Sequence, residues 1–214
     1  LRLGFCIKYE RKEKMTVIIA EKPSLARNIT SAIGNMKKCD GYYRGEEYIV
    51  TWAFGHLFTL ADIEHYNPLP EGERYWTMKN LPCFPQQYHF ELKKDKNKVT
   101  DKGVEKQFKI IQELCCDPQT DTIVNAGDSD REGEIIVRLC MDHALQGCPD
   151  KDKKSKKRLW LPDQTPETVR AALSDMKDES EYDNLASEGF ARTYIDWLYG
   201  VNLTRYATIK CGTL

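Results

Sequence analysis

Residues 122–134 read TIVNAGDSDREGE, a short apolar run that leads directly into a loop with four acidic residues. The run TIVNA at 122–126 has the β-branched composition of a strand, and EIIVRLCMDHAL at 134–145 is a helical run. A strand, a loop and a helix in this order form the repeating unit of parallel α/β sheets, where ligands bind beyond the carboxyl ends of the strands. The stretch therefore predicts an acidic loop at the ligand-binding edge of a parallel sheet.

A second strand–turn–helix unit lies near the start of the chain. Residues 16–20 (TVIIA) form a continuous β-branched run, which is typical of a strand buried on both faces. The segment KPS at 22–24 then opens a helical stretch that extends to about residue 33. Residues 48–53 (YIVTWA) read as another strand. Strands that alternate with helices predict an α/β fold with a parallel sheet.

The remaining segments predict irregular structure, loops and a helical tail. Residues 62–90 are rich in proline and aromatics, which predicts ordered irregular structure that passes over the sheet. The lysine-rich stretches 93–98 (KKDKNK) and 151–158 (KDKKSKKR) read as solvated loops, the second just before a short strand around 158–161.

The chain divides into three parts on this evidence. Residues 1–14 precede Met15 and read as an N-terminal extension, residues 15–164 form the α/β domain, and residues 165–214 begin a helical domain. In the last part, helices are predicted for 165–177 and 186–207. The apolar stripe on the second of these helices requires a partner surface.

Composition sets broad limits. The 214 residues are 41% hydrophobic, which is too apolar for a disordered chain, and the net charge is −1. DNA binding would therefore depend on local clusters of charge. Eight cysteines without a C-x-x-C pair, and four scattered histidines, do not form zinc-ligand spacing, so the cysteines read as reduced thiols. The absence of a long apolar run or a secretory signal pattern predicts an intracellular protein without a membrane span.

The acidic loop suits a metal ion. Asp128 and Asp130 are two residues apart, so both can face the same way in an extended loop and offer hard oxygen ligands to Mg²⁺. Without a metal, repulsion between the acids would raise at least one carboxylate pKa. Glu21 follows the first strand and would reach the same edge, where Lys22 adds a positive charge for a phosphate. Helix capping alone explains one or two of the acids, whereas the full set favours phosphoryl transfer.

Two motifs taken together resemble the Toprim domain of type IA DNA topoisomerases, of the topoisomerase III kind. They are IIAEKPSLAR at 18–27 and GDSDREGE at 127–134. The resemblance covers about residues 15–210 and implies a Rossmann-like parallel sheet flanked by helices, followed by the start of an all-helical domain. Further matching segments follow in order along the chain: GHL at 55–57, the stretch from Trp76 to Pro85, Arg192 with DWL at 196–198, and NLTR at 202–205.

The resemblance also implies roles for site residues. Glu21 would protonate the 3′ oxygen that leaves the cleaved phosphodiester, and Lys22 would hold the scissile phosphate. Asp128, Asp130 and Glu132, together with Glu21, would bind Mg²⁺.

A second group of residues is implied to contact DNA, namely His56, Arg131, Arg192 and Asp196. As isolated features, a lone histidine is more often structural and Arg192 is an ordinary helical arginine. The family acts without ATP on single-stranded or negatively supercoiled DNA, through a tyrosine that becomes linked to the 5′ phosphate. That tyrosine would lie beyond residue 214, so the resemblance predicts a protein of the cytoplasm, at the nucleoid or a plasmid, whose present 214 residues do not cleave DNA alone.

Two alternatives remain open. A Toprim metal-dependent nuclease would share the acids but need no tyrosine, and a non-catalytic single-stranded DNA-binding module would need no Mg²⁺. The sequence also departs from the family at Gly127, where many relatives have threonine.

Overall fold

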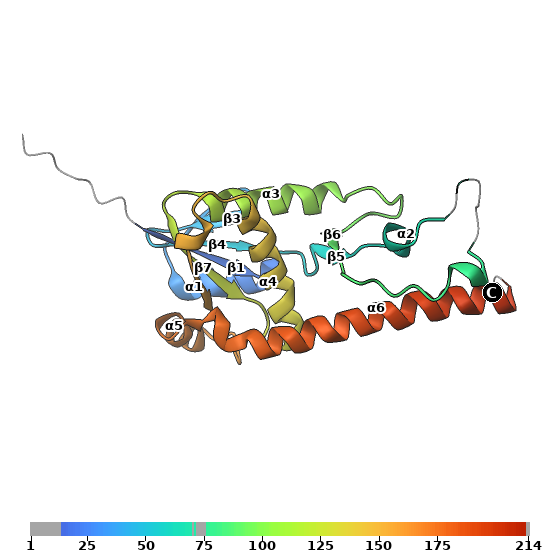
Figure 1. Ribbon diagram of the computed structural model, residues 1–214. Coiled ribbons are helices and arrows are strands. Elements are labelled where there is room, and N and C mark those ends of the chain that lie inside the picture. Colours follow the sequence, from blue (N-terminus) through green and yellow to red (C-terminus); the bar gives the residue numbers. More distant parts are fainter. Residues whose placement is uncertain (1–13, 70, 72–75, 213–214) are drawn as a thin grey trace, which may run out of the picture.

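A computed structural model describes residues 14–69, 71 and 76–212 (Figure 1). Its centre is a seven-stranded sheet with the order β2-β3-β4-β1-β7-β8-β9. The four inner strands run parallel, and the outer strands pair antiparallel with their neighbours. The strands are β1 (Met15–Ala20), β2 (Lys37–Lys38), β3 (Tyr42–Arg44), β4 (Tyr48–Trp52), β7 (Thr120–Ala126), β8 (Ser155–Arg158) and β9 (Lys177–Asp178).

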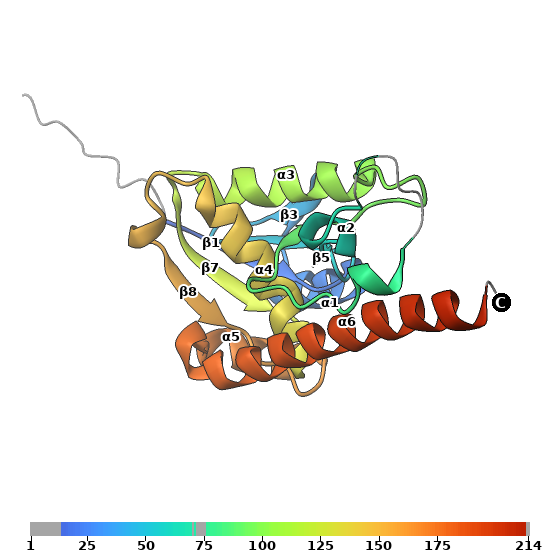
Figure 2. The same cartoon turned by 45° about the vertical axis from the view of Figure 1, so that its right-hand side comes forward.

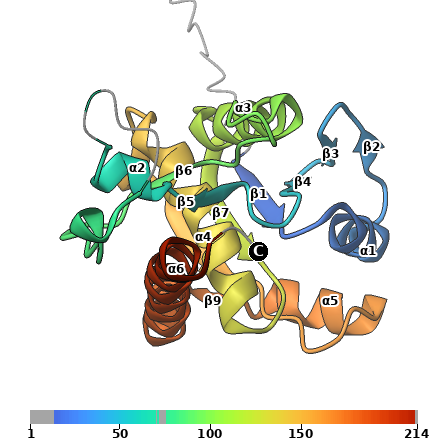
Figure 3. The ribbon, with the colours of Figure 1, turned by 90° about the vertical axis from the view of Figure 1, so that its right-hand side faces the viewer.

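Helices cover both faces of this sheet (Figure 3). One face packs against α3 (Lys102–Cys116) and α4 (Arg131–Gln146), and the other against α1 (Pro23–Ile33) and α5 (Pro166–Ser174). Alternate residues of β1 enter the two cores, which explains why the strand is apolar throughout. The predicted α/β fold with a parallel central sheet is therefore confirmed.

A long helix, α6 (Asp183–Cys211), packs against α4 and continues beyond the edge of the sheet (Figures 1 and 2). Residues 54–69 and 76–92 form an extended arm that lies along α6 (Figures 1 and 2). The arm holds a two-stranded sheet and short helical turns: β5 (Phe58–Leu60), β6 (Phe90–Leu92), α2 (Ile63–Tyr66) and η1 (Met78–Asn80). In the described residues, no helix has the length and apolar character needed to cross a membrane.

The arm is attached to α6 by aromatic and hydrogen-bonding contacts. Tyr88 stacks on Tyr194 with ring centroids 4.3 Å apart, and Trp197 donates from Nε1 to the carbonyl of Ala61 at 3.1 Å. The prediction that residues 62–90 pass over the sheet was wrong. Aromatic side chains of the arm pack against Phe190, Tyr194 and Trp197 of α6 and cover this part of its apolar stripe. Other large apolar side chains of α6, among them Ile195 and Leu203, remain exposed.

Two further expectations need correction. The stretch 151–158 is not a solvated loop, because it contains the turn η2 (Lys151–Lys153) and strand β8. Its charges are compensated by the fold: the Lys154 ammonium donates to two backbone carbonyls, and Lys156 lies 2.6 Å from Asp142. The tail after residue 164 is not all helical, because β9 joins the main sheet and is followed by the turn η3 (Glu179–Tyr182).

The cysteines also differ from expectation. Cys116 and Cys148 form a disulfide, with Cα atoms 5.0 Å apart. Cys116 ends α3 and Cys148 follows α4, and these helices pack side by side, so residues distant in sequence meet. The prediction of reduced thiols was wrong for this pair.

Candidate metal and nucleic-acid site

Four of the predicted site residues lie just beyond the carboxyl ends of neighbouring parallel strands. Glu21 and Lys22 follow β1, Asp128 follows β7, and His56 lies in the loop after β4. Because β1 pairs with both β4 and β7, these three loops meet at one edge of the sheet. The expectation that Glu21 would face the acidic loop is therefore confirmed.

Direct hydrogen bonds connect Glu21, Lys22 and Asp128. The backbone amide of Asp128 donates to Glu21 Oε2 at 3.1 Å, and Lys22 Nζ lies 2.5 Å from Asp128 Oδ2. Lys22 itself is in an extended conformation at the N-terminus of α1, with Pro23 in the first turn. The edge thus combines two carboxylates and one ammonium group next to a helix N-terminus.

The pKa of Glu21 is raised from its usual value, first by burial and then by repulsion from Asp128, while a hydrogen bond from the Asp128 amide and the charge of Lys22 oppose the rise. The pKa of Lys22 is also raised, chiefly by its hydrogen bond to Asp128. An upward carboxylate shift was predicted from repulsion, but burial is its larger cause. A carboxyl group with a raised pKa keeps its proton to a higher pH than an ordinary carboxyl group, which is what a general acid requires.

The acidic loop turns sharply into α4. Asp130 caps the helix, since its Oδ1 accepts from the amide of Gly133 at 2.7 Å. Gly127 and Gly133 come so close that a Cβ on Gly127 would lie 2.0 Å from the Gly133 carbonyl oxygen. A Cβ on Gly133 would lie 2.5 Å from the Asp128 amide nitrogen. In this conformation a threonine at position 127 would clash with the backbone of Gly133, which gives a steric reason for the glycine where many relatives have threonine.

Glu132 lies in the first turn of α4, which begins at Arg131 rather than near residue 134. Its side chain is exposed, and its Oε1 is 3.1 Å from His56 Nε2. Within the described ranges, no three His, Cys, Asp or Glu side chains are arranged as a ready metal site. The structure therefore brings Glu21 to Asp128 and Glu132 to His56, as two pairs on one edge.

The residues nevertheless fit a hard divalent cation. Asp128 Oδ1 is buried and lacks a hydrogen-bond partner, whereas its Oδ2 is paired with Lys22. A buried carboxylate oxygen without a partner is costly, and a cation such as Mg²⁺, which prefers carboxylate oxygens and retains several waters, would satisfy it. The Glu21 carboxylate lies next to Asp128, from whose backbone amide it accepts a hydrogen bond.

A cavity of about 340 Å³ lies beside these acids. Its lining residues come from the loop after β4, from the start of α4 and from α6: His56, Arg131, Glu132, Ile135, Gly189, Arg192, Thr193 and Asp196. All four residues that the resemblance assigned to DNA therefore meet here. Arg131 Nη1 is 2.6 Å from Glu188, and Arg192 Nε is 3.4 Å from Asp196, so both guanidinium groups are held in place but remain accessible.

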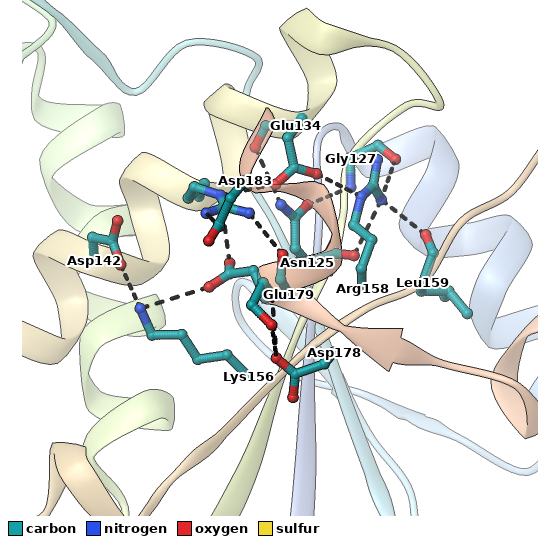
Figure 4. Close-up of polar contacts among 12 residues, drawn as sticks. Asn125, Gly127, Glu134, Asp142, Lys156, Arg158, Leu159, Asp178, Glu179 and Asp183 are labelled. Atoms are coloured by element: carbon teal, nitrogen blue, oxygen red, sulfur yellow. Dashed lines mark hydrogen bonds and ion pairs between the residues drawn. The ribbon is translucent and has the colours of Figure 1, made fainter. Parts of the chain in front are cut away.

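Sequence reasoning missed a buried ionic cluster directly beneath the acidic loop (Figure 4). Glu134 and Arg158 are both fully buried, with Nε of the arginine 2.7 Å from Oε2 of the glutamate. Burial lowers the pKa of Arg158, and the charge of Glu134 opposes that shift. In the sequence, Arg158 appears only as the last cation of a basic run, so nothing local indicates its burial.

Comparisons with known proteins identify the family of the chain. The model of the Toprim domain matches residues 16–161. The chain is 38% identical over 195 residues to the DNA topoisomerase 3 of Staphylococcus epidermidis (strain ATCC 12228 / FDA PCI 1200), and 36% identical over the same length to that of Staphylococcus haemolyticus (strain JCSC1435). Each alignment covers 91% of the chain but 25% of the relative, so the chain spans about a quarter of the length of the curated relatives it matches. Since the Toprim match extends over well more than half of its residues, the chain belongs to the Toprim domain family.

Proposed function

We propose that this chain supplies the acid and Mg²⁺ site of an ATP-independent type IA DNA topoisomerase. The observation that carries the proposal is the contact between Glu21 and the Asp128 loop at the ends of adjacent strands, with Lys22 paired to the same aspartate. The similarity to proteins named DNA topoisomerase 3 supports the same conclusion. The proposed substrate is single-stranded or negatively supercoiled DNA of the nucleoid or of a plasmid in the cytoplasm.

In this proposal, Asp128, Asp130 and Glu132 hold Mg²⁺ together with Glu21. When bound there, Mg²⁺ would supply positive charge that offsets the negative charge of the phosphate. To bind the ion, Asp130 would have to give up its capping hydrogen bond from the Gly133 amide, and Glu132 would have to give up its contact with His56. Both side chains are exposed, so they are free to change rotamer.

Glu21 and Lys22 would act on the phosphodiester itself. In its protonated form, Glu21 gives its proton to the 3′ oxygen as the bond between that oxygen and phosphorus breaks. Its raised pKa increases the fraction of the acid form. Lys22 holds the non-bridging oxygens of the phosphate beside the N-terminus of α1. The attacking tyrosine, in this proposal, is carried by a further part of the longer protein.

The cavity beside the acids would guide the DNA strand to them. Arg131 and Arg192 can contact phosphates, because each has an exposed guanidinium group on the cavity wall. His56 lines the cavity and pairs with Glu132, which supports a role for this histidine in the proposed DNA path.

A cleavage assay tests this function. Labelled single-stranded DNA is incubated with the chain, and separately with a longer protein that contains it, in the presence and absence of Mg²⁺. On a denaturing gel, we expect a protein-linked 5′ end with the longer protein and no adduct with residues 15–214 alone. Free nicked ends without any adduct would instead identify a metal-dependent nuclease. DNA binding that is unaffected by Asp128→Asn, without any cleavage, would identify a binding module.

A further inference from the structure

Arg158, the last residue of β8, forms hydrogen bonds that hold the acidic loop. Its Nη1 donates to the carbonyls of Asn125, Gly127 and Leu159, at 3.2, 3.0 and 2.9 Å, and its Nη2 donates to the carbonyl of Asp128 at 2.8 Å. The residue is fully buried, so water cannot replace these donors. One guanidinium group therefore holds the backbone carbonyls of the segment that leads from the end of β7 to Asp128, the residue that meets Glu21 and Lys22.

We propose that Arg158 is a positioning residue for the candidate metal and acid site. It contacts neither the proposed ion nor the DNA. It acts by holding the backbone of Gly127 and Asp128, which places the Asp128 carboxylate beside Lys22 and its amide against Glu21. The part of this inference that concerns Mg²⁺ rests on the proposed function, whereas the part that concerns the loop does not.

Glu134, the last acid of the GDSDREGE motif, is the counter-charge in this arrangement and not a metal ligand. Its two oxygens face two arginines: Oε2 lies 2.7 Å from Arg158 Nε, and Oε1 accepts from Arg138 Nε at 2.9 Å. The contact with Arg158 is an ion pair without the alignment of a hydrogen bond. Because the side chain of Glu134 is completely buried between these cations, it cannot turn to the exposed edge.

The same network reaches the helix that lines the cavity (Figure 4). Arg138 donates from Nη1 to Asp183 at 2.6 Å and from Nη2 to the carbonyl of Glu179 at 2.9 Å. Asp183 is the first residue of α6, and Glu179 begins the preceding turn η3. Through Glu134, the acidic loop and the first turn of α6 therefore share one buried set of charges.

An arginine is required at this position by the number and direction of the acceptors. Its planar fork offers five donors, while a lysine ammonium is a point charge on a flexible chain and cannot reach Glu134 and the loop carbonyls at the same time. Each carbonyl that loses its donor in a buried site is left unsatisfied. Arg158→Lys keeps the charge beside Glu134 and removes the fork, so it isolates the positioning role.

The test compares Arg158→Lys with Arg138→Lys in residues 15–214. The control variant loses an arginine contact to the same Glu134 but no contact to the loop. Two quantities are measured: amide hydrogen exchange at Asp128 and Asp130, whose amides donate to Glu21 and to the Asp128 carbonyl, and the affinity for Mn²⁺ as a paramagnetic probe for Mg²⁺. For Arg158→Lys, we expect exchange to rise about tenfold and affinity to fall on the order of tenfold, with little change in either for Arg138→Lys.

The outcomes separate the alternatives. Equal effects in both variants, or no effect at the loop in Arg158→Lys, would overturn the positioning role. If the wild-type chain did not bind Mn²⁺, the proposed metal function would be refuted. The hydrogen-exchange measurement would still decide the role of Arg158. Should Arg158→Lys not fold, the wild type provides the test: a held guanidinium gives separate, slowly exchanging Nη protons in NMR spectra, and rapidly averaged signals would contradict the proposal.

Discussion

At the scale of single residues, the two oxygens of Asp128 have different surroundings. Lys22 pairs with Oδ2, and Oδ1 is buried without a partner. We predict that Asp128→Asn lowers the affinity of the chain for Mg²⁺ by at least about tenfold, because an amide oxygen carries no net charge. Calorimetric titration with Mg²⁺ measures the change. Asp175→Asn, at an exposed position paired with Lys177, serves as the control and should bind Mg²⁺ as the wild type does.

Glu21 gives a prediction for pH. Its folded-state pKa is raised above the ordinary 4.5, so the protonated form favours folding. The corresponding stability is complete below about pH 4.5 and is lost as the pH rises through the raised folded-state pKa. The Glu21→Gln variant has no titrating group at this position. The unfolding free energy of the wild type, measured relative to that of the variant, should therefore fall as the pH rises through this range and then become constant. Urea unfolding without metal at several pH values checks the sign, and a constant difference from pH 4 to 8 would refute it.

At the scale of secondary-structure elements, α4 and α6 approach closely at Gly189. A Cβ at this position would lie 2.7 Å from both the Arg131 carbonyl oxygen and Ile135 Cγ2. We predict that Gly189→Ala lowers stability by about 1–3 kcal/mol, because the helices must move apart. Gly200→Ala is a matched control in the same helix, since nothing lies near its added Cβ, and it should be neutral or stabilising. Thermal unfolding of both variants measures the contrast, which would disappear if α6 were not packed on α4.

The inner elements were predictable because their signals are local. The run at 16–20 is apolar at every position, as required of a strand between two helical layers, and Pro23 marks the start of the next helix. The meeting of Glu21 and Asp128 followed from these assignments alone, because parallel strands end at a common edge.

Other features depend on partners distant in the chain. The lysines of β8 resemble a solvated run until Asp142 and Glu179, from other elements, are placed beside them. Likewise, Arg158 is buried only because Glu134 and the loop carbonyls surround it, and the disulfide forms only because α3 packs against α4. Such features require the tertiary structure, and no local pattern encodes them.

At the scale of the whole molecule, the net charge of −1 gives no general attraction for DNA. Binding would then depend on a few phosphate contacts in the cavity. We predict that Arg192→Ala weakens single-stranded DNA binding and reduces the slope of log affinity against log salt by about 1. Arg170→Ala, which removes an arginine of α5 outside this cavity, is the control and should leave the slope unchanged. Fluorescence anisotropy at several salt concentrations provides the measurement, and equal slopes for all three proteins would exclude Arg192 from the DNA path.

The length of α6 has a mechanical consequence. Its 29 residues correspond to a rod of about 44 Å. One end is fixed to the buried charges through Asp183, and the remainder carries the arm through Trp197 and Asn202. A rotation of about 5° at the fixed end moves the opposite end by about 4 Å. The geometry of α6 is therefore that of a lever: a small change of direction at Asp183 would be magnified along the helix toward its far end, beyond the contacts at Trp197 and Asn202 that hold the arm.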